Sequence, residues 1–210
     1  MTTPQSGTFY PLTLRLFDIL HRPEGERGGR VVLVSSARAE EGKTFVARAL
    51  AHCMADLSND AVLLVDGNIE DPSLHRHYGA ENTLGFSDCL ASGDCAAAKL
   101  HDTPRTNLKV MTIGQTPKPG LLFKSQAYSA FLEHFRSRFA VILIDGGLLG
   151  ASGCLPHQSD GTIMVVDSSR TRREVIQGVM AQANVEKSRY LGAVLNKRMQ
   201  YIPGPLYRHF

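Results

Sequence analysis

The residues best suited to chemistry lie in the stretch 31–51, VVLVSSARAEEGKTFVARALA. An apolar run leads into a polar loop that ends in Gly42-Lys43-Thr44, and an alanine-rich helical pattern follows at once. A strand, a loop and a helix in this order are typical of a P-loop, in which backbone N–H groups and the positive helix N-terminus hold a polyphosphate. Lys43 is then expected to reach the β- and γ-phosphates, and Thr44 to hold Mg²⁺. The alternative is an ordinary helix cap at a strand–helix turn.

The loop departs from the usual P-loop pattern at its start. G-x-x-x-x-G-K-[ST] begins with a glycine, whereas this sequence has Ala37 at that position. The residues that we expect to surround a bound nucleotide are those of the loop and the first helical turn. They are Ala37, Arg38, Ala39, Glu40, Glu41, Gly42, Lys43, Thr44 and Phe45. The sequence therefore predicts ATP, accompanied by Mg²⁺, as the ligand.

Three polar residues, Asp66, Asp145 and Asn196, each follow a short apolar run that reads as a buried strand. The carboxyl ends of parallel strands lie at one edge of a sheet, and ligands of such sheets bind beyond that edge. We therefore expect these three side chains to converge on the P-loop.

The elements that must position these residues alternate along the chain. Apolar runs predict strands at 31–34, 61–65, 108–113, 140–144, 162–166 and 191–195, and helical patterns occur at 9–21, from 44 onward, at 121–138 and at 171–186. A short helix is also expected near the end of 69–79, and another short helical pattern surrounds Asp88. This alternation predicts an α/β fold, a doubly wound and mostly parallel sheet.

The length of 210 residues fits one domain. We expect an N-terminal helix and linker at 1–29, a P-loop domain at 30–197 and a basic, aromatic tail at 198–210. A net charge of +3, without any known nucleic-acid motif, predicts no nucleic-acid partner. The four cysteines form no C-x-x-C pair, which favours a reducing cytoplasm over a disulfide framework. No signal peptide and no direct membrane span are expected, so membrane association would require a partner.

Four segments resemble a known family, the bacterial tyrosine kinases (BY-kinases, the CpsD/CapB group), within the MinD/ParA-type P-loop ATPases. Residues 35–44, SSARAEEGKT, resemble the Walker A motif, and residues 62–79 resemble the second acidic motif, with Asp66, Pro72 and His75 at matching positions. Residues 139–147, FAVILIDGG, resemble Walker B. The closing strands of that fold are matched by 159–175 and 191–197.

The resemblance implies roles for individual residues. Lys43, Asp66 and Asp145 would be catalytic, and Thr44, Asp66 and Asp145 would hold the metal. Asn196 stands where related folds contact the adenine. Such a site suits phosphoryl transfer, which needs positioning and cationic stabilisation of the phosphate oxygens. A carboxylate near Mg²⁺ can also accept the proton of a tyrosine hydroxyl.

Several positions depart from the family pattern around the nucleotide. Asn68 replaces the second aspartate of the acidic motif and cannot act as a base. Glu70 replaces a basic residue, and Glu40 stands at a P-loop glycine position, where a positive φ would cost on the order of 1 kcal/mol. Gly146-Gly147 replaces two prolines after Walker B. Arg38 occupies the position of the signature lysine of the MinD/ParA group, and its alternative is a solvated loop residue.

Two sequence features that the family uses for autophosphorylation and subunit assembly are shorter in this chain than in the family. The run of tyrosines that ends family kinases is represented by Tyr201 and Tyr207, and the N-terminal E-x-x-R-x-x-R motif by Arg15. The resemblance therefore leaves both the phosphoacceptor and a homo-oligomeric state open.

Three functions remain. The first is a cytoplasmic ATP-binding, tyrosine-kinase-like protein of exopolysaccharide or capsule biosynthesis and export. It would work at the inner membrane with a membrane chain-length (co-polymerase) protein, and ATP-dependent autophosphorylation would be its activity. The second is a degenerate, non-catalytic scaffold of the export machinery. The third is a MinD/ParA-like dimerising ATPase without tyrosine kinase activity.

Overall fold

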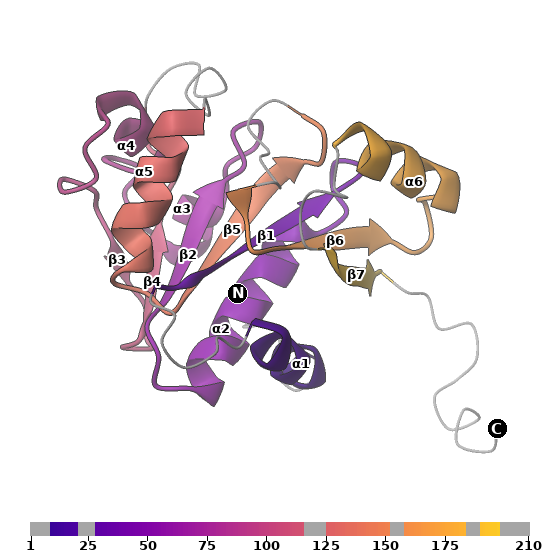
Figure 1. The fold of residues 1–210 in the computed structure, drawn as a ribbon, viewed down its shortest axis with the longest axis horizontal. Coiled ribbons are helices and arrows are strands. Elements are labelled where there is room, and N and C mark those ends of the chain that lie inside the picture. The colour runs from indigo at the N-terminus through magenta and orange to yellow at the C-terminus, as the bar shows by residue number, and fades with distance from the viewer. Residues whose placement is uncertain (1–8, 21–27, 116–124, 152–157, 184–189, 198–210) are drawn as a thin grey trace.

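A seven-stranded sheet forms the centre of the computed structural model, which describes residues 9–20, 28–115, 125–151, 158–183 and 190–197. The strands are β1 (Arg30–Ser36), β2 (Val62–Gly67), β3 (His101–Asp102), β4 (Leu108–Met111), β5 (Val141–Leu148), β6 (Gly161–Asp167) and β7 (Tyr190–Asn196). Their order is β3-β4-β2-β5-β1-β6-β7, and every pairing is parallel except that of β3 with β4. Figure 1 shows the twisted sheet with helices on both sides.

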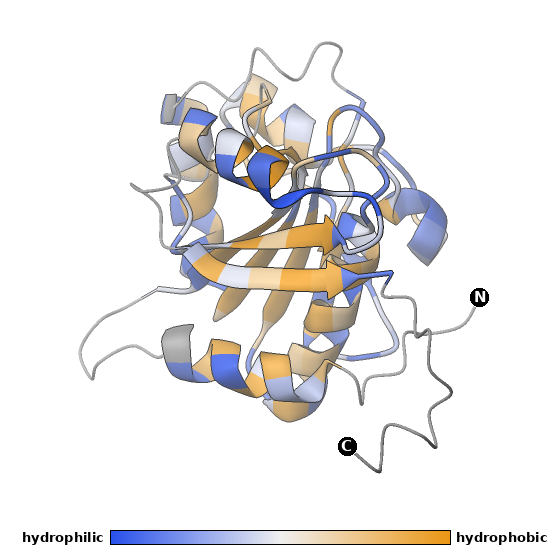
Figure 2. Cartoon of the chain, turned by 90° about the vertical axis from the view of Figure 1, so that its right-hand side faces the viewer, coloured by the Kyte–Doolittle hydropathy of each residue, from blue (hydrophilic) through white to orange (hydrophobic). Residues whose placement is uncertain are grey.

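Helices cover both faces of the sheet. The first layer holds α1 (Tyr10–Leu20), α2 (Lys43–Leu57) and α3 (Leu74–Tyr78), and the second holds α4 (Phe86–Ser92), α5 (Ser125–Arg136) and α6 (Arg173–Gln182). Each face of the sheet packs against one helix layer and forms a separate hydrophobic core. In β1, Val32 and Val34 pack in the first layer, whereas Val31 and Leu33 pack in the second. The central strands therefore contribute apolar side chains to both layers, and they are mostly orange in Figure 2.

The doubly wound, mostly parallel sheet predicted from the sequence is confirmed. The six predicted strands correspond to β1, β2, β4, β5, β6 and β7. Within the part of the chain that the structure describes, no helix is both long and apolar enough to cross a bilayer. The tail 198–210, with Tyr201 and Tyr207, lies outside the described residues, as do parts of the helices predicted at 121–138 and 171–186.

Two strands differ from the prediction. Antiparallel β3 was missed because it is only two residues long and polar. β5 was predicted at 140–144 and to end in Asp145, but it continues through Gly146 and Gly147 to Leu148. Gly146 pairs with Gly67 of β2, and Leu148 pairs with Ser36 of β1. Proline has no N–H group for such pairing, so glycines at these positions allow the strand to continue.

Candidate functional site

The P-loop joins β1 to α2, which begins at Lys43. Gly42 precedes the helix with φ 93°, in the left-handed region that favours glycine. A Cβ atom at this position would lie 2.1 Å from Nδ2 of Asn196. Glycine is therefore required at Gly42 both by backbone conformation and by the close approach of β7.

The two glycine replacements in the loop have different consequences. Glu40 has φ 62°, so the strain expected there is present. Ala37 is not among the described non-glycine residues with positive φ, which are Glu40, Leu84 and Lys197. The substitution at Ala37 therefore brings no strain of this kind.

Glu41 turns its carboxylate away from the open side of the loop. Its side chain is buried, with the residue only 2% exposed. Oε2 accepts a hydrogen bond from the Arg38 backbone N–H at 2.8 Å, and Oε1 accepts bonds from the Asp167 N–H at 2.9 Å and the Thr171 hydroxyl. The carboxylate thus ties the loop to the carboxyl end of β6 and gives the loop its shape.

The end of β7 holds the same loop from a second direction. Nδ2 of Asn196 donates to the carbonyl oxygen of Glu41 at 2.8 Å, and Nζ of Lys197 donates to that of Glu40 at 2.6 Å. Lys197 also pairs with Asp167 at 3.4 Å. Asn196, which the resemblance places at the adenine, therefore has its amide nitrogen engaged by the loop.

A cavity of about 270 Å³ opens beside the P-loop. It is lined by Ala39, Glu40, Gly42, Lys43, Thr44, Asn68, Glu70, Asp71 and Leu148. Lys43 is only 7% exposed, and within the described residues it makes no ion pair. The lining joins the P-loop to the loop that follows β2, so the two motifs meet as the strand order requires.

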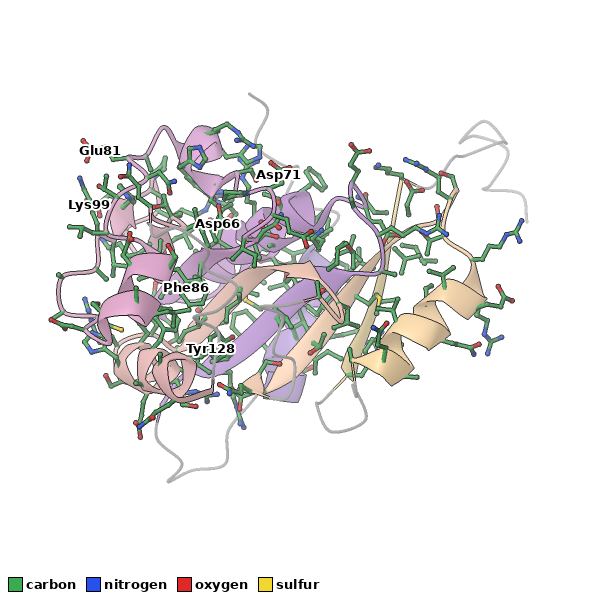
Figure 3. The ribbon with its side chains drawn as sticks, turned by 90° about the horizontal axis from the view of Figure 1, so that it is seen from above. Asp66, Asp71, Glu81, Phe86, Lys99 and Tyr128 are labelled. Atoms are coloured by element: carbon green, nitrogen blue, oxygen red, sulfur yellow. The ribbon has the colours of Figure 1, made fainter. Side chains whose placement is uncertain are left out.

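Asp66 is fully buried at the end of β2 and caps α3. Its Oδ2 accepts the backbone N–H groups of Ser73 and Leu74, each at 2.9 Å, and Oδ1 accepts that of Asn68 at 3.3 Å. Burial raises the pKa of Asp66 to about 6, although these backbone hydrogen bonds oppose the rise. Figure 3 shows Asp66 near the loop that carries Asp71, apart from the aromatic layer of Phe86 and Tyr128.

Asp145 lies in register with Asp66 on the neighbouring strand β5. It is fully buried, and among the described residues no hydrogen-bond donor lies within normal distance and angle of either carboxylate oxygen. Burial, and then the negative charge of Asp66, raise the pKa of Asp145 to about 7. The nearby Thr44 hydroxyl, as a weak hydrogen-bond donor, and then the positive charge of Lys43 oppose this rise of the pKa. A buried carboxylate beside a second carboxylate and a threonine hydroxyl offers the oxygen ligands that suit a hard cation such as Mg²⁺.

The side chain of Asn68 makes hydrogen bonds within its own loop. Nδ2 donates to the carbonyl oxygen of Asp71 at 3.0 Å, and Oδ1 accepts the Asp71 N–H at 3.4 Å. Glu70 and Asp71 are exposed at the cavity. The second position of the acidic motif is thus a turn-forming residue in this chain.

The remaining predicted residues are exposed, and of these Ala39 also lines the cavity. Arg38 and Ala39 are exposed. Phe45 is 45% exposed, and its ring packs edge-on against Phe9 with centroids 5.9 Å apart. Sequence reasoning left out Asp167 and Thr171, which hold Glu41. Asp167 follows the apolar run 162–166, as Asp66 and Asp145 follow theirs, but it binds Glu41 through its backbone N–H, so its side chain gave no signal of this contact.

Replacing Glu41 with alanine is expected to weaken ATP binding by about tenfold to a hundredfold, because three hydrogen bonds that shape the loop are lost. Calorimetric titration of the variant with ATP and Mg²⁺ measures the effect. Glu81→Ala, which removes an exposed carboxylate paired with Lys99, is the matched control and should bind as the unaltered chain does. Equal affinity in the two variants would remove Glu41 from this role.

Comparison with known proteins finds relatives among bacterial tyrosine kinases and a polysaccharide transport protein. The tyrosine-protein kinase YwqD of Bacillus subtilis is 26% identical over 175 residues, which are 81% of this chain and 73% of that protein. The tyrosine-protein kinase CpsD of Streptococcus agalactiae is 24% identical over 173 residues, 80% of this chain and 74% of that protein. The succinoglycan biosynthesis transport protein ExoP of Rhizobium meliloti is 27% identical over 175 residues, but these are only 22% of its length. No family model matches the chain.

Solved structures confirm the fold. The kinase domain of VpsO superposes with a TM-score of 0.78 at 24% identity, and the match covers 92% of this chain and 94% of that domain. The cell division ATPase MinD of Pyrococcus furiosus superposes with a TM-score of 0.67 at 20% identity, covering 86% of this chain and 78% of MinD. The architecture is therefore that of the MinD/ParA-like P-loop NTPases.

Proposed function

We propose that this chain, whose homologues are bacterial tyrosine kinases, binds ATP with Mg²⁺ at the P-loop and acts as a tyrosine-kinase-like protein. The observation that carries the proposal is the buried carboxylate of Asp145, which has no hydrogen-bond donor in normal geometry among the described residues and lies beside Asp66, Lys43 and Thr44. A buried charge without a partner is costly, so a cation that completes this site stabilises it.

The residues of the site have distinct roles in this proposal. The loop N–H groups and the N-terminus of α2 receive the phosphates, and the Lys43 ammonium stabilises the negative charge on their oxygens. Thr44, Asp66 and Asp145 would hold Mg²⁺, which when bound neutralises charge on the transferred phosphoryl group. In the transfer, the bond from the γ-phosphorus to the bridging oxygen breaks and a bond to the tyrosine oxygen forms. A carboxylate, for which Asp66 is the candidate, accepts the hydroxyl proton.

The relatives support a biological setting for this proposal. The name of ExoP connects it with succinoglycan biosynthesis and transport, and we propose a role for this chain in exopolysaccharide or capsule export. The chain would be cytoplasmic and would reach the membrane through a chain-length (co-polymerase) protein. We retain 30–197 as the P-loop ATPase/kinase-like domain, with 1–29 and 198–210 as flanking segments.

A second candidate is a scaffold that binds nucleotide without phosphorylating tyrosine. The geometry of Asn68 favours it, because an uncharged amide that is engaged by Asp71 supplies neither a base nor a negative charge. Glu40 and Glu70 also place carboxylates at the cavity, where phosphates would bind. A dimerising ATPase of the MinD/ParA type is a third possibility that shares the same P-loop.

Calorimetric titration with ATP and Mg²⁺, followed by phosphotyrosine detection on the same sample, separates these functions. Binding together with phosphotyrosine supports the kinase and directs attention to Tyr201 and Tyr207 as acceptors. Binding without phosphotyrosine supports an ATPase or a nucleotide-dependent scaffold. A chain that does not bind ATP would overturn the proposal and leave a scaffold without nucleotide.

A further inference from the structure

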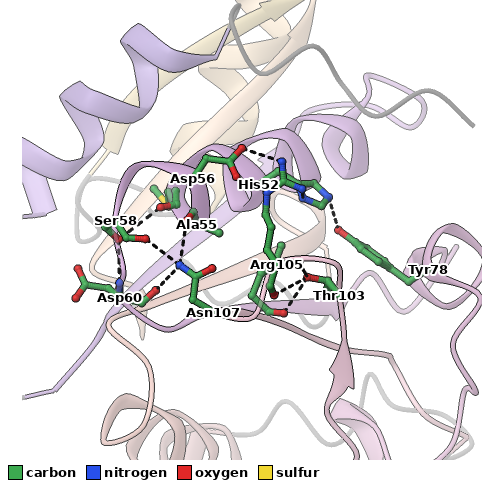
Figure 4. A network of polar contacts seen from close by, with 11 residues as sticks. His52, Ala55, Asp56, Ser58, Asp60, Tyr78, Thr103, Arg105 and Asn107 are labelled. Carbon is green, nitrogen blue, oxygen red and sulfur yellow. Dashed lines mark hydrogen bonds and ion pairs between the residues drawn. The ribbon is translucent and has the colours of Figure 1, made fainter.

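A polar network lies between α2, α3 and the loop before β4, away from the P-loop. Its centre is His52 of α2, which is 7% exposed. Arg105 makes a bidentate ion pair with Asp56, at 2.5 and 2.8 Å, and donates from Nη1 to Nδ1 of His52 at 2.8 Å. Nε2 of His52 lies 3.0 Å from the hydroxyl oxygen of Tyr78, the last residue of α3. Figure 4 shows these contacts.

The network fixes the proton on His52. A guanidinium group can only donate hydrogen bonds, so Nδ1 must be the acceptor and Nε2 must carry the proton. The Nε2–H group therefore donates to the Tyr78 hydroxyl oxygen. Burial, followed by the charges of Arg105 and Arg48, lowers the pKa of His52 to about 4, whereas Asp56 opposes the shift. The imidazole is thus neutral near pH 7, and the donation runs from Arg105 through His52 to Tyr78.

Helix α3 depends on contacts at its two ends. It has only five residues, of which only Leu74 is buried, and a helix of this length has no stability of its own. Its first N–H groups donate to Asp66, as described above. Its last turn is held on α2 by the Tyr78–His52 bond, by Arg48 at 5.4 Å from the centre of the Tyr78 ring, and by the 3.2 Å contact of Arg48 with His77.

We propose that His52 and Tyr78 are positioning residues for the candidate metal site. By holding the end of α3 on α2, they fix its beginning, where Ser73 and Leu74 bind the Asp66 carboxylate. The Ser73 hydroxyl also lies 3.5 Å from that of Thr44. The functional part of this inference rests on the proposed ATP and Mg²⁺ binding. The structural part, a link from Tyr78 to Asp66, stands independently.

Tyr78→Phe tests the functional part through the Mg²⁺ dependence of ATP binding. The variant loses the acceptor for His52 but keeps the aromatic ring under Arg48. ATP affinity is measured once with Mg²⁺ and once with EDTA. In the unaltered chain Mg²⁺ should strengthen binding, and Tyr78→Phe should reduce that gain by about fivefold to tenfold, the effect of one lost hydrogen bond. Affinity in EDTA should stay unchanged, because the P-loop itself is not altered.

Two further variants make the result specific. Tyr128→Phe makes the same chemical change at a buried tyrosine in the opposite layer and should leave the Mg²⁺-dependent gain intact. His52→Leu should reproduce the loss. The double variant with Tyr78→Phe should lose no more than the larger single effect, because both changes break the same contact between His52 and Tyr78. An equal loss with Mg²⁺ and with EDTA, or an unchanged gain in Tyr78→Phe, would overturn the positioning role.

Amide hydrogen exchange tests the structural part without nucleotide. The N–H groups of Ser73 and Leu74 are bonded to Asp66, and their exchange should accelerate about fivefold to tenfold in Tyr78→Phe but not in Tyr128→Phe. If the unaltered chain fails to bind ATP, the proposed function fails, and exchange still shows whether Tyr78 holds α3. Unchanged exchange would reject the link itself, whatever the chain binds.

Discussion

Lys43→Met is expected to abolish ATP binding and leave the fold intact. The side chain of Lys43 is largely buried in the first turn of α2, where the P-loop ends. Methionine retains an unbranched apolar chain of similar length but removes the charge. Because charge-assisted hydrogen bonds to phosphate are among the strongest in proteins, we expect affinity to fall by about a hundredfold or more. Calorimetric titration with ATP and Mg²⁺ measures the loss, and a thermal melt verifies the fold.

Lys109→Met is the matched control for this experiment. Lys109 lies on β4 and pairs with Asp102 at the far edge of the sheet, so its loss should leave ATP affinity unchanged. A Lys43→Met variant that binds ATP as well as this control would remove the P-loop from the account of nucleotide binding. A variant that no longer melts cooperatively would instead assign Lys43 a role in folding.

Asp145→Asn is expected to stabilise the metal-free chain and to eliminate the Mg²⁺-dependent part of ATP binding. Burial raises the pKa of Asp145 to about 7, so the folded state holds its proton more tightly than the unfolded chain does. Stability from this group is therefore present at low pH and is lost as pH rises from about 4 through 7. At pH 8 in EDTA, asparagine should add roughly 2–4 kcal/mol to the free energy of unfolding, because it carries no charge to bury.

Urea unfolding of both chains across pH 5 to 8, with EDTA, measures this difference. The gain should be smallest near pH 5 and should grow toward pH 8. Asp102→Asn is the contrasting control: a hydrogen bond from Lys109 lowers the pKa of Asp102, so the same substitution there should not stabilise the chain. A gain that does not depend on pH, or ATP binding that still responds to Mg²⁺, would contradict the role given to Asp145.

The sequence predicted most of the sheet because buried parallel strands are continuous apolar runs. Once the strands were assigned, the meeting of Asp66 and Asp145 beside the P-loop followed from the geometry of parallel sheets. The resemblance to bacterial tyrosine kinases was carried by the same motifs, and the kinase relatives confirm it.

The contacts that shape the loops could not be predicted in this way. From the sequence, Glu41 is expected to place negative charge beside the phosphates. In the structure its carboxylate instead accepts hydrogen bonds from Asp167 and Thr171, which lie far along the chain. Asn196 reads as a contact for the base, yet its amide nitrogen binds the P-loop. Such bonds depend on where separate loops meet in space, and no local pattern of residue types records that meeting. The roles of the individual site residues remain predictions.

Because β5 continues past Asp145, the segment that follows this residue can rearrange only slowly. The segment after Asp145 is held by its pairing with β1 and β2, by the Ser35 hydroxyl bound to the Gly147 carbonyl at 2.8 Å, and by the Leu149 N–H bound to Ser36. A free loop rearranges in nanoseconds to microseconds, whereas a paired strand moves only when part of the sheet opens, which is far slower. The residues that follow Asp145 therefore form a slow element, and any rearrangement of this segment has to wait for that opening.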